Sequence, residues 1–495
     1  MYNQLSIVMK KHIYKRCGRL AAAALFTFSL PLFTSCDDYL DVKPKSQVES
    51  TELFQSEAGF KDALNGVYIK LTSSSLYGKE MKYGTVDILG HLYYTVGSGS
   101  YSYINSGSYS NSSASGIGNA IWSNAYNAIA SLNVLLAQLD DASQKMFSTD
   151  NYNVIKGEAL GLRAFLHFDL LRLFGPSYLV GPDEPAIPYV TEYTYQVTPT
   201  STVGQALDQV IADLEQAAAL LKSSDPIATN RVITTDDDGG YLSDRVYHFN
   251  YYAAVAALAE AHLWKNDYSN AARYAREVID SGKFSWTPVE NIATTEADRD
   301  RTYINEQIFA LQMDELDDYV LGSIYGTVRY NATFKFYSSG LNNIFPAATN
   351  ATDWRRTYFF SNENCGGSYY YTNTKLWQEG MTDDMVKRMP MFRLPEMYLI
   401  LAECDVMNAA PYLEEVSNHR GNNIHVTAAT ESALNDAITM EYAREFIHEG
   451  KLFFRYKRIN AAQMYGGYGF TKQNYNTANY VLPLPNEEKQ FGNRE

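Results

Sequence analysis

The chain has 495 residues, of which 46% are hydrophobic, and its 56 Asp and Glu against 41 Lys and Arg give a net charge of −15. Such an acidic chain repels phosphate backbones, which argues against binding to nucleic acid through counterion release. It is long enough to bury a large core without staples, so its four cysteines do not predict a disulfide framework.

Residues 1–35 are predicted to be a lipoprotein signal peptide and are set aside from the fold. Basic residues lie between Lys10 and Arg19, and the apolar stretch that follows is shorter than the roughly 20 residues that span a bilayer. The stretch ends in small residues followed directly by Cys36, which is typical of a lipobox. We expect Cys36 to carry acyl chains that anchor the protein to a membrane. Ordinary signal cleavage beside an incidental cysteine is the less favoured alternative.

Apolar residues at spacings of three and four predict a mainly helical mature chain. The first half shows four such runs, over residues 60–71, 122–136, 151–174 and 203–221. Asn151 is the expected cap of the third helix, and Gly175-Pro176 is expected to end it. Thr202 and Gln205 have the spacing of a capping box at the start of the fourth.

The clearest paired unit covers residues 250–282, where two alanine-rich helices flank a short turn at Asn266-Asp267. Its length is that of one tetratricopeptide repeat, about 34 residues. Later helices are predicted to begin at Pro395 and near Glu431. Because clean β-alternation is scarce, we expect stacked helical hairpins with long loops and little β structure.

Three segments consist mainly of Tyr, Ser, Gly and Asn, and we call them the tyrosine-rich segments. They cover residues 93–119, 361–374 and 463–480. Connections of this length are uncommon in a folded domain unless they are functional or disordered. They are therefore the first places to look for a binding surface.

The sequence contains no common catalytic motif of a metalloprotease, serine hydrolase or nucleotide hydrolase, and no cofactor is expected. Residues 236–239, Asp-Asp-Asp-Gly, suggest a calcium loop but lack its glycine at position six and glutamate at position twelve, so a solvated turn is favoured. Glu158 and Arg163 are interpreted as a buried supporting pair. Cys404, in an apolar helical run, is expected to be an inert thiol.

Several short motifs, taken in order, resemble the RagB/SusD family over nearly the whole mature chain. They are Cys36 to Asp41, Asn65 to Tyr68, Ile121-Trp122, Glu158 to Ala164, Arg393 to Glu396 with Ala402-Glu403, Glu441 to Gly450, and Val481 to Pro485. Three positions depart from the family pattern: Tyr442 and Leu452 stand where arginines are usual, and Arg455 replaces an aspartate. These departures leave local packing open rather than membership.

The resemblance implies a scaffold of about four tetratricopeptide-like helical pairs. It implies a SusD-like N-terminal region over residues 36–230 and a RagB/SusD C-terminal region over residues 231–495, packed as one unit. It further implies a cell-surface lipoprotein of the outer membrane that works with a SusC-like TonB-dependent barrel. Family members usually bind glycans, whereas RagB-type members handle peptides.

The ligand hypothesis depends on aromatic side chains, because tyrosine offers a large amphipathic contact area at low entropic cost. The predicted contact residues are Tyr93, Tyr94, Tyr101, Tyr103 and Trp286. A mobile surface is the alternative for the first segment, and core packing is the alternative for Trp286. Trp122 and Trp264 are expected in the core.

We therefore expect a non-enzymatic protein that captures oligosaccharide for a transporter. Oligopeptide capture is the second hypothesis. A glycoside hydrolase, which needs two carboxylates about 5–9.5 Å apart across a cleft, is less favoured. A structural surface lipoprotein without a small ligand is a further alternative.

Overall fold

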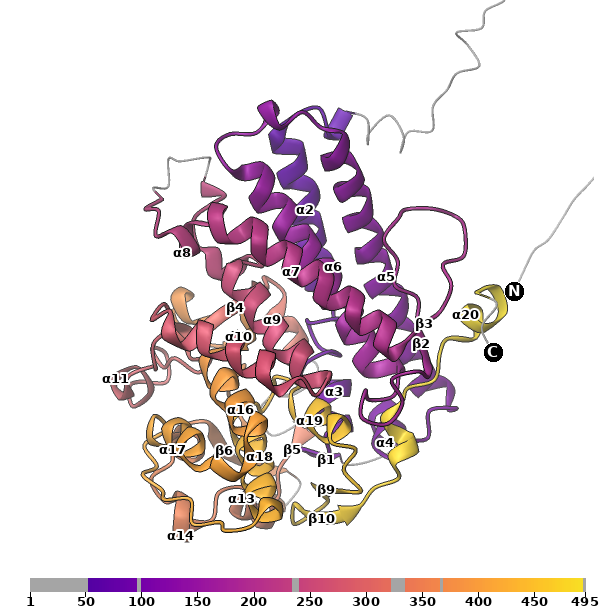
Figure 1. Ribbon diagram of the computed structural model, residues 1–495. Helices are drawn as coiled ribbons and strands as arrows, with labels where there is room; N and C mark the ends of the chain where they lie inside the picture. Colours follow the sequence, from indigo (N-terminus) through magenta and orange to yellow (C-terminus); the bar gives the residue numbers. More distant parts are fainter. Residues whose placement is uncertain (1–51, 96–98, 234–239, 322–333, 366–367, 493–495) are drawn as a thin grey trace, which may run out of the picture. The chain divides into compact units, whose positions relative to one another are not determined.

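The computed structural model describes residues 52–95, 99–233, 240–321, 334–365 and 368–492 (Figure 1). Cys36 and residues 236–239 lie outside these ranges, so the lipid anchor and the calcium loop stay predictions. The described residues from 52 onward belong to one compact unit. The boundary expected at residue 230 stays a prediction too. Along the described parts of the chain, no helix is both long and apolar enough to cross a membrane.

The main helices form a continuous row in which each packs against the next (Figure 1), and this confirms the mainly α prediction. The tetratricopeptide-like pairing stays a prediction. The row consists of α2 (Glu57–Leu71), α5 (Ser112–Asp141), α6 (Asn151–Phe174), α7 (Val203–Ser224), α9 (Tyr251–Trp264), α10 (Tyr268–Asp280), α16 (Leu394–Cys404) and α17 (Ala410–Asn418), with α18 (Glu431–Glu445) also against α16.

Shorter helices connect the row. They are α3 (Thr85–Leu89), α4 (Ser100–Asn105), α8 (Pro226–Thr229), α11 (Val289–Ile292), α12 (Leu316–Val320), α13 (Ser338–Ile344), α14 (Ala347–Asn350), α15 (Trp354–Tyr358), α19 (Leu452–Arg458) and α20 (Asn486–Phe491).

Side-chain caps begin several of the main helices, including α2, α7 and α9. The Thr202 side chain accepts from the Gln205 amide and the Gln205 side chain accepts from the Thr202 amide, which confirms the capping box of α7. The Asn151 prediction is wrong by one residue. Asp150 occupies the cap position, while Asn151 is buried in the first turn and donates from Nδ2 to Glu57 Oε1 at 2.5 Å.

The strands form antiparallel two-stranded pairs within the described residues. They are β1 (Tyr94–Thr95) with β5 (Phe334–Lys335), β2 (Pro185–Ile187) with β3 (Ser201–Thr202), β4 (Gln307–Gln312) with β8 (Arg388–Arg393), β6 (Phe360–Cys365) with β7 (Ser368–Asn373), and β9 (Gln463–Gly466) with β10 (Thr471–Asn474).

The tyrosine-rich segments are not the long loops that their composition predicts. Residues 93–119 contain β1, α4 and the first turns of α5, where Asn111 accepts from the Ser113 amide as a cap. The segments at 361–374 and 463–480 form the β6–β7 and β9–β10 hairpins. Tertiary pairing overrides weak local propensity here.

The helical core matches the sequence pattern in part. Trp122 and Trp264 are buried as predicted. Glu158 and Arg163 are both buried supports, but they do not pair with each other. Burial alone would raise the pKa of Glu158, yet the charge of Arg245, 2.7 Å away, and a neighbouring histidine lower it to about 2. Arg163 instead binds Asp213 on α7 at 2.8 Å.

Candidate ligand-binding site

The three tyrosine-rich segments, far apart in the sequence, meet in one region of the fold. Tyr94 of β1 pairs with Lys335 of β5, and the same strand continues to a β-bridge between Phe336 and Tyr371 of β7. The amides of Phe336 and Tyr371 each donate to the other's carbonyl at 2.8 Å. A short antiparallel assembly of β1, β5 and β7 therefore joins the first segment to the second.

The third segment reaches this assembly through α13. The side chains of Ser339 and Asn343 donate to the carbonyls of Tyr468 and Gly469 at 3.2 and 2.7 Å. In Figure 1, α13, β5, β9 and β10 lie together at the lower end of the ribbon. The fold thus brings all three segments to one place.

Three tyrosines meet here and form what we call the tyrosine cluster. They are Tyr337, just before α13, Tyr370 of β7 and Tyr468, between β9 and β10. The ring of Tyr337 lies 3.9 Å from that of Tyr468 and 5.0 Å from that of Tyr370, centroid to centroid. Tyr468 remains 60% exposed, and Tyr337 and Tyr370 are half-buried. Aromatic faces are therefore held in fixed relation at the surface.

Neutral polar side chains border the cluster. Ser338, Ser339, Asn342 and Asn343 on α13 are exposed, and Ser339 and Asn343 are the residues that bind the backbone beside Tyr468. The ammonium group of Lys335 lies 4.8 Å from the Tyr370 ring centroid, a cation–π distance. Hydroxyl and amide groups beside rigid rings can contact both the edges and the faces of a flat polar ligand.

The structure places the predicted residues of the first segment at different depths. Tyr93, expected at a ligand surface, lies in the core with its ring stacked 5.0 Å from Phe334. Tyr101 is partly buried and donates to Glu80 Oε1 at 2.9 Å. Tyr103 is 37% exposed, and only the backbone of Tyr94 is described.

Trp286 lies apart from the tyrosine-rich segments. One of its faces stacks on His419 with the ring centroids 4.5 Å apart, and it also contacts Tyr398 and the guanidinium of Arg420. It is half-buried. Its described neighbours therefore favour the packing alternative.

Sequence reasoning did not single out Tyr337, Tyr370 or Tyr468 as contact residues. Tyr370 and Tyr468 lie in segments recognised by composition, but nothing local distinguishes them from their neighbours. Tyr337 begins a run, Tyr-Ser-Ser-Gly-Leu-Asn-Asn over 337–343, with the same composition. That signal was available in the sequence.

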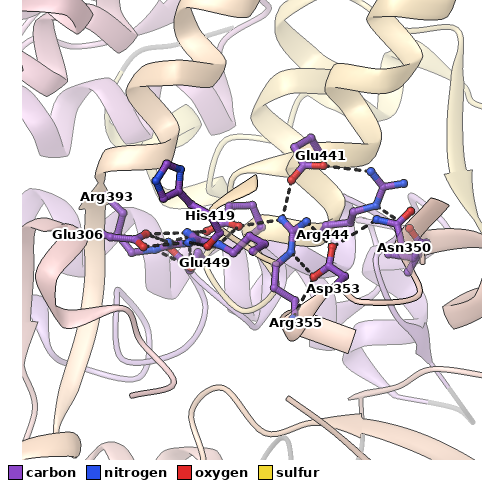
Figure 2. A network of polar contacts seen from close by, with 12 residues as sticks. Glu306, Asn350, Asp353, Arg355, Arg393, His419, Glu441, Arg444 and Glu449 are labelled. Carbon is purple, nitrogen blue, oxygen red and sulfur yellow. Dashed lines mark hydrogen bonds and ion pairs between the residues drawn. The ribbon is translucent and has the colours of Figure 1, made fainter. Parts of the chain in front are cut away.

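A buried network of ion pairs lies next to the elements that carry the tyrosine cluster, and Figure 2 shows part of it. Arg393 contacts Glu445 at 2.7 Å and Glu449 at 2.6 Å, and Arg420 contacts Glu306 and Glu445 at 2.6 and 2.7 Å. All five side chains are buried. Burial alone would raise the pKa of Glu445, but Arg420 and Arg393 lower it well below its ordinary value.

The network extends to the elements that carry the tyrosine cluster. Arg355 contacts Glu441 at 2.6 Å, and Glu441 binds Arg444 at 3.0 Å (Figure 2). Arg444 donates to the carbonyl of Ile344, the last residue of α13, at 2.7 Å. Lys375, just after β7, donates to the Glu445 carbonyl at 2.9 Å. The position of both elements therefore depends on this network.

The charged groups of the ion-pair network support the structure. The carboxylates of the network are paired with arginine or lysine and buried, which does not suit them to donate or accept protons from a substrate. Among the described residues, no group of three or more His, Cys, Asp or Glu side chains is arranged to hold a metal ion. The rings of the tyrosine cluster and the exposed serine and asparagine side chains of α13 carry no charge.

Two family models match the chain. One, described as starch-binding associating with outer membrane, covers residues 38–232, and the other, described as the SusD family, covers residues 288–490. The chain belongs to the SusD family. It is therefore a SusD-type binding protein, and the description of the first model associates it with the outer membrane.

Curated relatives of this SusD family member include two proteins of Formosa agariphila. SusD-like protein P2 is 23% identical over 522 residues, which cover 93% of this chain and 96% of P2. SusD-like protein P38 is 23% identical over 288 residues, which cover 55% of this chain and 48% of P38, so the match spans about half of that protein.

Solved structures share the fold. A SusD-like carbohydrate binding protein from Bacteroides vulgatus matches with a TM-score of 0.69 at 19% identity, over 89% of this chain and 97% of its own. A SusD superfamily protein from Bacteroides thetaiotaomicron matches with a TM-score of 0.68 at 21% identity, over 89% and 98%. Identities this low establish the fold alone.

Some of the residues that carry the SusD family resemblance are members of the buried ion pairs, including Arg393, Glu441, Glu445 and Glu449. The departures from the family pattern are accommodated locally. Tyr442 donates to Glu403 Oε1 at 2.8 Å, Arg455 binds the same carboxylate, and Leu452 is buried among apolar side chains. The family signature thus describes the frame, not the tyrosine cluster.

Proposed function

We propose that this SusD family protein captures oligosaccharide at the cell surface and delivers it to a SusC-like TonB-dependent transporter, held to the outer membrane by acyl chains on Cys36. The observation that carries the proposal is the tyrosine cluster with its border of exposed serine and asparagine side chains. The related B. vulgatus protein described as carbohydrate binding supports the same ligand class.

A neutral sugar ring fits this chemistry in two ways. Its C–H faces pack against aromatic rings, and its hydroxyl edges exchange hydrogen bonds with Ser338, Asn342 and similar side chains. Contacts of this kind give millimolar to micromolar dissociation constants, about −4 to −8 kcal/mol. That range suits capture followed by release to a transporter.

The residues predicted from sequence take different roles in the proposal. Tyr103 is exposed and contributes a further contact, and Tyr94 stays a candidate at the start of β1. Tyr93 and Tyr101 support the site from beneath, because both pack against Phe334 of β5. Trp286, outside the cluster, would form a separate contact.

The direct test is a glycan array probed with the mature chain, followed by calorimetry on each glycan that binds. We expect Tyr370→Ala combined with Tyr468→Ala to weaken binding about 30-fold, because two aromatic contacts are removed and each is worth roughly 0.5–1.5 kcal/mol. Tyr195→Ala is the matched control, because Tyr195 is 98% exposed and lies outside the cluster.

Three results would redirect the proposal. Binding only to peptides, in a parallel pulldown from a peptide library, would establish the oligopeptide hypothesis. Hydrolysis of a bound glycan by the purified chain would make it an enzyme. Normal binding by the double variant would move the site away from the cluster.

The anchor and the partner need separate experiments. Cys36→Ser should release the protein from the outer membrane fraction, and the wild type should co-purify with a barrel protein from solubilised membranes. A Cys36→Ser protein that stays in the membrane would remove the lipid anchor from the proposal.

A further inference from the structure

Three buried polar side chains lie behind the β1–β5–β7 assembly and form a continuous chain. The Tyr93 hydroxyl lies 2.6 Å from Asp87 Oδ2 on α3 and 2.6 Å from His448 Nδ1, in the turn after α18. On its other side, His448 Nε2 lies 3.3 Å from the carbonyl oxygen of Asn373. Asp87, Tyr93 and His448 are each almost inaccessible to solvent.

Counting hydrogens along this chain restricts its protonation. The Asn373 carbonyl only accepts, so Nε2 of His448 carries a hydrogen. If the imidazole is neutral, Nδ1 accepts from the Tyr93 hydroxyl, and that hydroxyl can then only accept from Asp87, which must be protonated. If Asp87 is ionised, Nδ1 must also carry a hydrogen. Both arrangements contain one proton more than an ionised Asp87 beside a neutral His448.

We propose that Asp87, Tyr93 and His448 are positioning residues that share one proton, and that this proton holds together the backbone beneath the tyrosine cluster. When it leaves, one of the three contacts must face two acceptors with no hydrogen between them. The consequence for ligand binding rests on the proposed function, whereas the shared proton does not.

This row of hydrogen bonds involves residues at or beside the ends of two strands of the site, so losing the proton would affect the backbone there. Tyr93 directly precedes β1, and Asn373 is the last residue of β7. The amides of His448 and Gly450 donate to the Asp87 carboxyl oxygens at 2.9 and 3.0 Å. Both residues have positive φ, 68° and 70°, so the turn is tight and depends on these bonds.

The surroundings favour the neutral form of the pair. Burial raises the pKa of Asp87 to about 7, although hydrogen bonds from Tyr93, Gly450 and His448 oppose the rise. Burial lowers the pKa of His448 to about 3. The charged side chains around the pair include Glu449, which pairs with Arg393 and Lys375, Lys82, which donates to the Glu449 carbonyl at 3.4 Å, and Glu80, which accepts from the Thr85 amide at the start of α3. Tyr83 contacts the imidazole ring, and α4 brings no charged side chain to α3.

The test follows Asp87 and His448 directly, without a ligand, in the mature chain labelled with ¹³C at aspartate carboxyls and ¹⁵N in histidine rings. Between pH 5 and 8 we expect the Asp87 carboxyl and the His448 ring nitrogens to change with one common midpoint. Hydrogen exchange in residues 368–373, corrected for intrinsic rates, should become about fivefold faster above that midpoint, the effect of one lost hydrogen bond.

Tyr93→Phe keeps the ring packing and removes the connecting hydroxyl, so the two signals should no longer change together. Tyr101→Phe, which removes a hydroxyl in the same segment that binds Glu80 instead, should leave the common midpoint in place. An Asp87 carboxyl that is ionised while the His448 ring is neutral throughout this range would overturn the proposal, and so would a common midpoint that survives in Tyr93→Phe. Either result would leave the glycan-array test of the proposed function untouched.

Discussion

The buried ion-pair network and the tyrosine cluster are connected through α13 and β7, yet their side chains differ in charge and in exposure to solvent. The network gathers five cations and five anions from segments between Glu306 and Glu449, all buried except the partly exposed Arg444. The cluster consists of neutral rings that remain accessible, with serine and asparagine beside them.

The difference separates what defines the family from what defines the ligand. A buried charge tolerates little change, because removing one partner leaves the other unpaired in a medium of low dielectric constant. An exposed tyrosine can be exchanged at small cost in stability. Several residues that carry the SusD family resemblance, such as Arg393 and Glu445, lie in the network, whereas none of the three cluster tyrosines belongs to a motif that carries it.

The largest expected effect comes from Arg393→Met. It leaves Glu445 and Glu449 short of a cation inside the protein, and we expect the free energy of unfolding to fall by about 3–5 kcal/mol. Urea unfolding followed by circular dichroism measures it. Lys387→Met is the control, since it removes the same charge from an exposed pair with Asp314 and should change stability by less than about 1 kcal/mol. Equal effects would erase the contrast between the two regions.

The next effect belongs to the cluster. Tyr337 contacts both other rings, so Tyr337→Ala should weaken binding of an array-selected glycan about tenfold, or about 1.4 kcal/mol. Its urea midpoint should stay close to that of the wild type. Tyr337→Phe keeps the ring and should retain most of the affinity. A large loss of stability in the alanine variant would show that the cluster is part of the frame.

A smaller effect is expected for Thr202→Ala, which removes the capping box of α7. The free energy of unfolding should fall by about 1 kcal/mol, the usual value of an N-cap side chain. Thermal unfolding beside Thr200→Ala, a neighbouring threonine before the helix, isolates the cap. A loss as large as that of Arg393→Met would mean that burial is not what distinguishes the network.

The smallest expected effect is the pH dependence of the stability that Glu57 contributes. Burial opposes ionisation of Glu57, but hydrogen bonds from Lys61, Asn151 and Ser148 lower its pKa from 4.5 to about 2. Because the folded value is the lower one, the stabilisation is complete above about pH 4.5 and disappears as the pH falls through 2. Glu57→Gln should be less stable than the wild type by under about 1 kcal/mol at pH 6 and equal to it near pH 2. A difference that grows on acidification would contradict the assignment.

Sequence reasoning predicted the helical frame well because its signals are local. Periodicity located α2, α6, α7, α9 and α10, and a capping box marked the start of α7 to the residue. The pairing of β1 with β5 could not be predicted, since it joins residues about 240 positions apart in segments without alternation.

The composition of the candidate site could be predicted from the sequence, but the individual contact residues could not. A segment rich in tyrosine indicates a surface able to bind, yet depth depends on tertiary packing. Tyr93 and Tyr103 share one segment and one sequence context, but the first is enclosed by Phe334, Asp87 and His448 while the second faces solvent. Glu158 and Arg163 were recognised as buried supports, but their partners, Arg245 and Asp213, lie too far along the chain for any spacing rule.

The span of the buried ion pairs also bears on when the protein can fold. Glu306 pairs with Arg393 and Arg420, and Arg393 in turn pairs with Glu449. Until those residues have been synthesised, burying the Glu306 carboxylate would leave a charge without a partner, so it stays in water. The closure of such distant partners is slow and late. A polypeptide whose ion-pair network cannot close before Glu449 has been synthesised cannot complete its fold for most of its synthesis, and an incompletely folded chain can still pass through a narrow pore.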